Sequence, residues 1–246
     1  VNILRDLEIP HLTFGIAAPA DLFARDIEIT EDGVSFDVKL QGMHTLPIRL
    51  RMTGMFNVYN AIAAASCAMV LGISHEEIKA GLEKIANVPG RIEMLPTGTP
   101  YRVILDYAHA PDALENVLKT LREIAPGHEL ICLFGCGGDR DRTKRPEMAQ
   151  VAQKLADKII VTSDNSRTEN TADIMADIRS GMDISGKARS LFIEDREQAI
   201  RTAMMIASQG ATILLAGKGH ETYQIIGKEK RHFDEKEIIS NYINEL

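Results

Sequence analysis

The chain has 246 residues, of which 45% are hydrophobic and 26% charged, a composition typical of a folded globular protein rather than a disordered one. Its length is sufficient for one large domain or two ordinary ones. A formal net charge of -7 argues against partners that bind a basic face, namely nucleic acid and the anionic membrane surface.

Residues 1–53 are expected to be rich in β-structure. Asp26–Thr30 and Val34–Leu40 alternate apolar and polar residues, and the acidic, glycine-containing turn between them predicts a hairpin. A further strand is expected within His44–Met52. It is predicted at the edge of the sheet because Pro47 has no backbone N–H to donate.

The hydrophobic period then changes to that of helices. Asn57–Leu71 has apolar residues at helical spacing. Ser74, with Glu77 three residues later, forms a capping box that predicts a second helix ending near Ala86. The pattern is then broken by proline and glycine, so a domain boundary is predicted between residues 88 and 89.

Beyond this boundary, short apolar strands alternate with amphipathic helices. The predicted strands are Tyr101–Leu105, Leu130–Phe134, Lys158–Thr162, Ser190–Ile193 and Ala211–Leu215. The predicted helices are Asp112–Ala125, Pro146–Ala156, Ala172–Met182 and Arg196–Ser208. Repeated strand–helix–strand units require crossover connections, which predicts an α/β fold with a mostly parallel sheet and helices on both faces. A hairpin at Tyr223–Phe233 and a final helix from about Asp234 follow.

Polar residues follow four of these five strands, and ligands bind beyond the carboxyl ends of the strands in open parallel sheets. The four segments are Asp106–Asp112, Gly135–Pro146, Ser163–Glu169 and Ala216–Glu221. Glu194–Arg196, after the fifth strand, has an ordinary interpretation as a helix start. The convergence predicts an anion-binding and amino-acid-binding site at one edge of the sheet.

Each segment also has a plain structural interpretation. Gly135–Gly138 serves equally well as a tight strand-to-helix turn. The charges of Asp139–Arg142 are able to pair with one another, and Asp164 and Asn165 are common turn or capping residues. His220 lacks the second histidine of a zinc motif, so no metal site is predicted.

Several motifs are absent from the sequence, including the P-loop G-x-x-x-x-G-K-[ST] and the nucleophile motif G-x-S-x-G. The cysteines Cys67, Cys132 and Cys136 show no metal-ligand spacing, which favours a reducing compartment such as the cytoplasm. Cys136, on the glycine-rich segment, is interpreted as a small buried residue rather than a reactive thiol.

Six motifs nevertheless occur in a distinctive order. They are Gly54–Ala64, Pro89–Glu93, Asp106–Leu114, Gly135–Asp141, Asp164–Arg167 and Gly217–Glu221. Taken together they resemble the Mur ligase family, the ATP-dependent amino-acid ligases of bacterial peptidoglycan synthesis. Within the family, the last three motifs are similar to those of the UDP-N-acetylmuramoyl-tripeptide synthetases, which add the third residue of the peptide. The resemblance extends from about Gly54 to Leu246.

The resemblance implies two parts of a three-domain enzyme. Residues 1–88 would be the back of the central ATPase domain, and residues 89–246 a complete Rossmann-like carboxy-terminal domain. The UDP-sugar domain and the portion with the P-loop are expected to be missing, in keeping with a first residue, Val1, that is not methionine. The chain alone is therefore expected to be inactive, and the parent is expected to be a cytoplasmic monomer.

The resemblance also implies a reaction and its residues. ATP, with Mg²⁺, would phosphorylate the free carboxylate of the UDP-MurNAc-dipeptide, and the amine of meso-diaminopimelate would attack the acyl phosphate. The ATP-binding residues implied are Asn57 and Asn60 near the adenine, Arg91 at the phosphates, Asp106 at the ribose, and Tyr107 and His109 beside them. The diaminopimelate-binding residues implied are Arg140, Asp164, Asn165, Ser166, Arg167, Gly217 and Glu221.

These residues suit diaminopimelate because its second ammonium–carboxylate centre needs both a cation and an anion. Arg167 and Asn165 would bind the far carboxylate and Glu221 the ammonium. Ser166 departs from the family pattern, which has proline there. The alternatives are a lysine-adding form of the enzyme, a non-catalytic amino-acid or nucleotide-binding module, and another amide ligase such as a folylpolyglutamate or cyanophycin synthetase.

Overall fold

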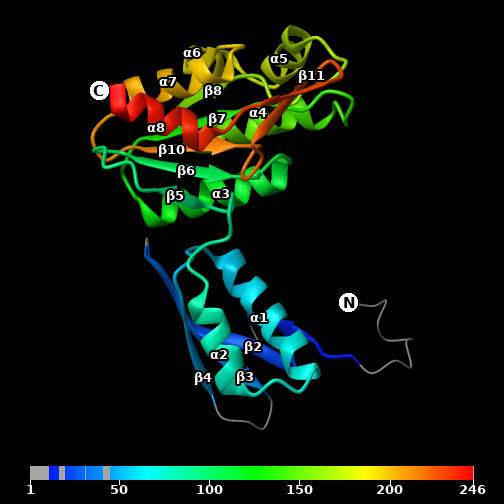
Figure 1. Cartoon of the computed structure of the whole chain (residues 1–246), viewed down its shortest axis with the longest axis vertical. Coiled ribbons are helices and arrows are strands. Elements are labelled where there is room, and N and C mark those ends of the chain that lie inside the picture. Colours follow the sequence, from blue (N-terminus) through cyan, green and yellow to red (C-terminus); the bar gives the residue numbers. More distant parts are fainter. Residues whose placement is uncertain (1–10, 17–19, 31, 41–44, 246) are drawn as a thin grey trace. The chain divides into compact units, whose positions relative to one another are not determined.

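The computed structural model describes residues 11–16, 20–30, 32–40 and 45–245, and the chain divides into two units between Asn87 and Val88 (Figure 1). Glu31 of the predicted turn and His44 of the predicted edge strand lie outside these ranges. No helix within them is long and apolar enough to cross a lipid bilayer.

The first unit contains a four-stranded sheet in the order β1-β2-β3-β4. Its strands are β1 Phe14–Gly15, β2 Leu22–Thr30, β3 Gly33–Leu40 and β4 Leu46–Leu50. β2 and β3 pair antiparallel with Thr30 opposite Gly33, which confirms the predicted hairpin. β4 is at the edge of the sheet, so Pro47 lies where it was predicted. The parallel pairing of the short β1 with β2 was not predicted.

Two helices pack against one face of this sheet, α1 Met55–Val70 and α2 His75–Lys84. Val34, Phe36 and Val38 alternate along β3 and are buried against apolar residues of both helices. Ser74 and Glu77 form the predicted capping box, since each side chain accepts a hydrogen bond from the other residue's backbone N–H. Both predicted helices are therefore confirmed, although Leu71, the last residue of the first predicted helix, lies beyond α1 and is 78% exposed.

The second unit is built on a six-stranded sheet in the order β5-β6-β10-β7-β8-β9, whose central arrows lie side by side in Figure 1. The strands are β5 Glu93–Leu95, β6 Arg102–Asp106, β7 Leu130–Phe134, β8 Lys158–Val161, β9 Ser190–Phe192 and β10 Thr212–Ala216. All neighbours pair parallel except β5, which is antiparallel to β6 and was not predicted. The last parallel strand of the chain, β10, lies in the middle of the sheet, between β6 and β7.

Helices cover both faces of this sheet, as predicted. They are α3 Pro111–Ile124, α4 Lys144–Leu155, α5 Thr171–Ser180, α6 Ile184–Ala188, α7 Arg196–Ile206 and α8 Glu235–Glu245. Ile104 belongs to the core formed with α3, α4 and α5, whereas its neighbour Leu105 belongs to the core formed with α7 and α8. Since successive strand residues point to opposite faces, the continuous apolar runs of the strands are explained by burial on both sides. The predicted α/β, Rossmann-like fold is confirmed.

A small hairpin, β11 Tyr223–Ile226 and β12 Glu229–His232, precedes α8 and turns where it was predicted. The backbone of β11 pairs with the segment that follows β8. Arg167 N donates to Ile225 O at 3.1 Å, and Gly227 N donates to Arg167 O at 2.7 Å. The hairpin therefore fixes a loop at the carboxyl edge of the large sheet.

Candidate functional site

A cavity of about 210 Å³ opens at the carboxyl ends of β6, β7, β8 and β10. We call it the rim cavity. Its lining residues are Tyr107, His109, Gly137, Arg140, Lys144, Asp164, Asn165, Arg167, Gly217 and Glu221. The structure thus brings together six of the seven residues predicted for the amino acid, and two of those predicted for ATP.

Hydrogen bonds fix the polar side chains of the rim cavity. Asn165 Nδ2 donates to Glu221 Oε2 at 3.0 Å, and Asn165 Oδ1 accepts from Ile225 N at 2.9 Å. Arg167 Nη1 donates to Gly138 O at 2.8 Å. These contacts use only part of the hydrogen-bonding capacity of the carboxylate and the guanidinium, so both groups remain able to bind a ligand.

Ser166, the seventh predicted residue, is buried at 3% exposure and does not line the rim cavity. A Cβ at Gly138 would overlap the carbonyl oxygen of Ser166. The glycine-rich segment after β7 therefore allows close packing of two loop backbones, in agreement with its plain structural interpretation. The main chain of Ser166 packs against Gly138, and its carbonyl accepts from Glu169 N at 3.1 Å.

The charged residues after the glycines do not form a ladder with one another. Asp139 Oδ1 accepts from Thr168 Oγ1 at 2.7 Å, and Arg142 pairs with Asp177 at 2.9 Å. Arg140 is exposed and lines the rim cavity. Of these charges, Arg140 is therefore the one placed to meet a ligand.

Beside this loop, a fully buried arginine joins two carboxylates. Arg145 forms ion pairs of 2.8 Å with both Glu169 and Asp177. The hydrogen bonds from Arg145, followed by one from Asp139 N, lower the pKa of Glu169 from 4.5 to about 2. Arg145 thereby anchors α4 and the loop that carries Arg167.

This pair is expected to make the protein sensitive to acid. Glu169 stays ionised in the folded state at pH values where it would be protonated in the unfolded chain, so its stabilisation is complete above pH 4.5 and is lost as the pH falls towards 2. Urea unfolding at several pH values should show a smaller loss of stability between pH 4.5 and 2 for Glu169→Gln than for the wild type. Equal losses in the two proteins would contradict the assignment.

The residues predicted for the nucleotide differ in their availability. Asp106 is 3% exposed, and its carboxylate accepts from Ile92 N at 2.8 Å and from Ala108 N at 2.7 Å. Burial raises the pKa of Asp106, although both hydrogen bonds oppose this shift. Its observed role is to hold the turn that carries Arg91 beside the loop after β6.

Arg91, Tyr107 and His109 form an accessible group. The Arg91 guanidinium lies 5.3 Å from the centroid of the Tyr107 ring, which stacks edge-on at 4.8 Å with the His109 ring. His109 Nδ1 is 2.9 Å from Tyr107 O, and Lys144 Nζ donates to His109 O at 2.8 Å. Partly exposed aromatic rings beside cations fit a nucleotide, since the rings are able to stack on a base and the cations are able to bind phosphates.

Asn57 and Asn60 belong to α1 of the first unit. Asn57 is buried, and its Nδ2 donates to Thr53 O at 2.8 Å, which fixes the start of the helix. Asn60 is exposed. Of these two predicted adenine residues, Asn60 is the one whose side chain is open to a ligand.

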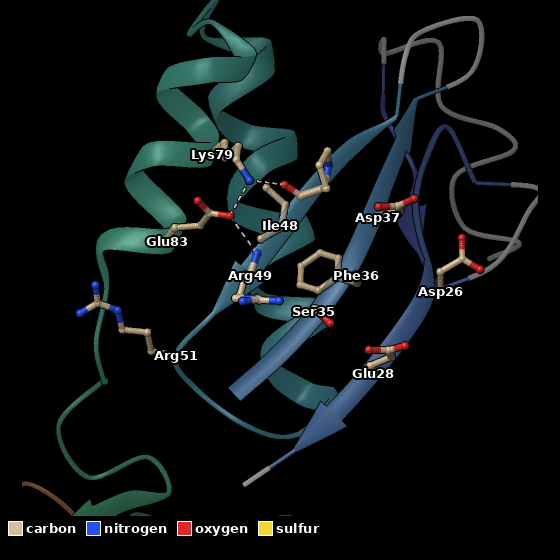
Figure 2. A pocket seen from close by; sticks show the side chains of 11 residues that line it. Asp26, Glu28, Ser35, Phe36, Asp37, Ile48, Arg49, Arg51, Lys79 and Glu83 are labelled. Atoms are coloured by element: carbon tan, nitrogen blue, oxygen red, sulfur yellow. Dashed lines mark hydrogen bonds and ion pairs between the residues drawn. The ribbon is translucent and has the colours of Figure 1, made fainter. Parts of the chain in front are cut away.

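A larger hollow of about 640 Å³ lies over the strands of the first unit. Figure 2 shows Asp26, Glu28 and Asp37 on β2 and β3, with Arg49 on β4. Arg49 N and Lys79 Nζ both donate to Glu83 Oε1, at 2.9 and 2.6 Å. No residue predicted for a ligand lines this hollow, and its charges partly neutralise one another.

Two buried cations beneath the rim cavity were not predicted from the sequence. Lys218 is fully buried next to Glu221, with 3.4 Å between Nζ and Oε2. Arg196 donates to Ser163 O at 3.1 Å and to Ala216 O at 2.9 Å, the residues just before Asp164 and Gly217. Glu194–Arg196 does begin a helix as predicted, with Asp195 as the N-cap of α7, and nothing in the local sequence distinguishes Arg196 from a surface arginine.

Cys136 is buried, with its Sγ 3.7 Å from Met148 Sδ, and burial raises the pKa of its thiol to about 12. A thiol with so high a pKa is protonated at neutral pH and is a poor nucleophile. This agrees with its interpretation as a small buried residue. Among the described residues, no group of three or more His, Cys, Asp or Glu is arranged to hold a metal ion.

Known proteins resemble the whole chain. It is 44% identical to UDP-N-acetylmuramoyl-L-alanyl-D-glutamate–2,6-diaminopimelate ligase 1 of Clostridium acetobutylicum over all of the chain and 50% of that protein. It is 46% identical to the corresponding ligase of Bacillus cereus over 94% of the chain and 46% of that protein. The chain thus spans about half the length of the curated relatives it matches.

Solved structures give the same picture. A UDP-N-acetylmuramoyl-L-alanyl-D-glutamate–2,6-diaminopimelate ligase matches 95% of this chain, over 47% of its own, with a TM-score of 0.64 and 37% identity. Folylpolyglutamate synthase of Mycobacterium tuberculosis, complexed with ADP, has a TM-score of 0.68 at 20% identity over 81% of this chain and 45% of its own, a likeness of fold alone. Residues 2–68 match the Mur ligase middle domain, and residues 90–219, more than half of the chain, match the family described as Mur ligase, glutamate ligase domain. The chain therefore belongs to the Mur ligase family.

Proposed function

We propose that this protein is part of an ATP-dependent ligase that adds meso-diaminopimelate to UDP-MurNAc-L-alanyl-D-glutamate in peptidoglycan synthesis. The observation that carries this proposal is the rim cavity, where Arg140 and Arg167 lie with Asn165 and the carboxylates of Asp164 and Glu221. The names of the relatives, which include 2,6-diaminopimelate among their substrates, support it.

The rim cavity suits an amino acid with two charged ends. Arg167, with Asn165 beside it, offers charge-assisted hydrogen bonds to a carboxylate. Glu221 accepts from an ammonium, and its orientation is fixed by Asn165 at 3.0 Å. Lysine has an ammonium but no carboxylate at its far end, so it would leave the Arg167 guanidinium without a carboxylate partner.

The proposed nucleotide residues are Arg91, Tyr107 and His109, with Asp106 as the residue that positions them. ATP, when bound, supplies the phosphoryl group that activates the substrate carboxylate. Mg²⁺ is proposed to bind with the phosphates of ATP, as this ion commonly does. Asn60 is proposed as a residue near the adenine, and Asn57 as its support within α1.

We further propose that residues 1–88 are part of the ATPase domain and residues 89–246 the amino-acid-binding domain. The matches of the first to a middle domain and of the second to a ligase domain support this division. A cytoplasmic location and a monomeric parent protein are proposed with it.

The proposal is tested by isothermal titration calorimetry of this protein with meso-diaminopimelate and with L-lysine. We expect measurable binding of meso-diaminopimelate and weaker binding of L-lysine. Equal affinities would favour the lysine-adding alternative, and the absence of binding of either amino acid would contradict the assignment of the rim cavity.

A further inference from the structure

The side chain of Lys218 lies inside the second unit although it follows a strand end at the rim. It is fully buried, between Gly217 and Gly219, whose φ values are +110° and +55°. A Cβ at Gly217 would lie 2.9 Å from Asp164 Oδ2, and one at Gly219 would lie 2.8 Å from Tyr107 Cβ. The two glycines therefore allow a tightly turned backbone that brings Lys218 beneath the rim cavity.

The ammonium of Lys218 has two carboxylates and two aromatic rings around it. Its Nζ is 3.4 Å from Glu221 Oε2 and 3.9 Å from Asp164 Oδ1. The ring centroids of Tyr223 and Phe233 are both 5.7 Å away. A buried ammonium is costly unless it is paired, and the partners here are the two carboxylates that line the rim cavity.

Lys218 changes the balance of charge that a ligand meets. Among the described residues, the lining of the rim cavity carries three cations, Arg140, Lys144 and Arg167, against the carboxylates of Asp164 and Glu221. With Lys218 beneath them, the cations outnumber the carboxylates by two. This excess opposes a ligand with more ammonium than carboxylate groups, and it does not oppose a ligand with equal numbers.

We propose that Lys218 is a specificity-determining residue that favours a diamino dicarboxylate over a diamino monocarboxylate in the rim cavity. This inference rests on the proposed function, because it presumes that an amino acid binds there. Lys218 does not line the cavity, so it acts through Glu221 and Asp164 as a positioning residue. Its positive charge weakens the attraction for the ammonium groups of either ligand and adds attraction for the second carboxylate, which only the dicarboxylate has, whereas Arg167 offers the direct contact to that carboxylate.

The test compares two ligands in four variants of this 246-residue protein. Isothermal titration calorimetry at fixed ionic strength measures the affinities for meso-diaminopimelate and L-lysine in Lys218→Met, Lys218→Gln, Lys218→Arg and the control Lys154→Met. Lys154 is exposed on α4, outside the rim cavity. Lys218→Gln keeps a hydrogen-bond donor towards Glu221 without the charge, so it provides a folded neutral variant if Lys218→Met unfolds.

In the neutral variants we expect the affinity ratio of meso-diaminopimelate over L-lysine to fall by about tenfold, as removal of one nearby charge predicts. Lys218→Arg and Lys154→Met should retain the wild-type ratio. A purely structural role for Lys218 would weaken both ligands by the same factor, so an unchanged ratio in the neutral variants would overturn this inference alone. A wild-type protein that binds neither amino acid would overturn the proposed function and this inference together.

Discussion

Replacing Arg196 by methionine is expected to lower the free energy of unfolding by about 3–5 kcal/mol, the usual cost of leaving one member of a buried ion pair without its partner. Arg196 is 1% exposed, and its Nε donates to Glu235 Oε1 at 2.8 Å. Glu235 is equally buried, and its Oε2 already has no hydrogen-bond partner. Without Arg196, this carboxylate and the carbonyls of Ser163 and Ala216 would lose their donor.

Urea unfolding followed by circular dichroism measures this effect, with Arg201→Met as the matched control on the same helix. Arg201 pairs with Glu197 and Glu245 near the surface, where solvent screens the ion pairs, so its replacement should lower the free energy of unfolding much less than Arg196→Met does. The double variant Arg196→Met/Glu235→Leu should recover part of the stability, because it no longer buries an unpaired charge. Similar losses for Arg196→Met and Arg201→Met would show that burial of the first pair is unimportant.

Replacing Arg167 by asparagine is expected to weaken meso-diaminopimelate binding by at least about thirtyfold, since truncating a charged partner of a buried charge pair costs about 2–5 kcal/mol. Asparagine is chosen because Arg167 has a φ of +49°, a conformation that asparagine adopts more readily than alanine. The affinity for L-lysine should fall much less, because lysine has no far carboxylate to bind. Calorimetric titration of both ligands provides the measurement.

Arg142→Asn is the control for this prediction. Arg142 lies on the same rim but pairs with Asp177 at 2.9 Å and does not line the rim cavity. It should therefore leave the affinity for meso-diaminopimelate within about twofold, as expected for a charge that contacts no ligand. A loss as large as that of Arg167→Asn would mean that the net charge of the rim, rather than the Arg167 contact, holds the ligand.

The sequence predicted the parallel sheet well because its central strands are buried on both faces and are therefore continuously apolar. β7 has the predicted bounds, and β6, β8 and β10 differ from the prediction by a residue at one or both ends. β5 escaped prediction because it has three residues and includes Glu93, whose carboxylate accepts from Gly90 N at 2.8 Å. A strand that short has no detectable alternation.

The sequence predicted those residues of the candidate site that directly follow the parallel strands, because the carboxyl ends of these strands lie at one edge of the sheet. Lys218 and Arg196 could not be placed, because their burial depends on partners such as Phe233 and Glu235, which are distant in sequence. Ser166 was assigned by its neighbours in a motif, yet it is buried and does not line the rim cavity. Local sequence patterns identify the edge of the sheet that carries the candidate site. The buried residues beneath that edge can be identified only from tertiary contacts.

The central position of β10 has a consequence for synthesis on the ribosome. β6 and β7 precede β10 in the chain and do not pair with each other, since β10 lies between them and pairs with one edge of each. Until Thr212–Ala216 has emerged from the ribosome, each of the two strands has one edge that lacks its hydrogen-bonded neighbour. Unpaired apolar strand edges favour aggregation of the nascent chain. An mRNA truncated before the codons of this strand should therefore yield insoluble protein, and the second unit is expected to fold only after Thr212–Ala216 has been synthesised.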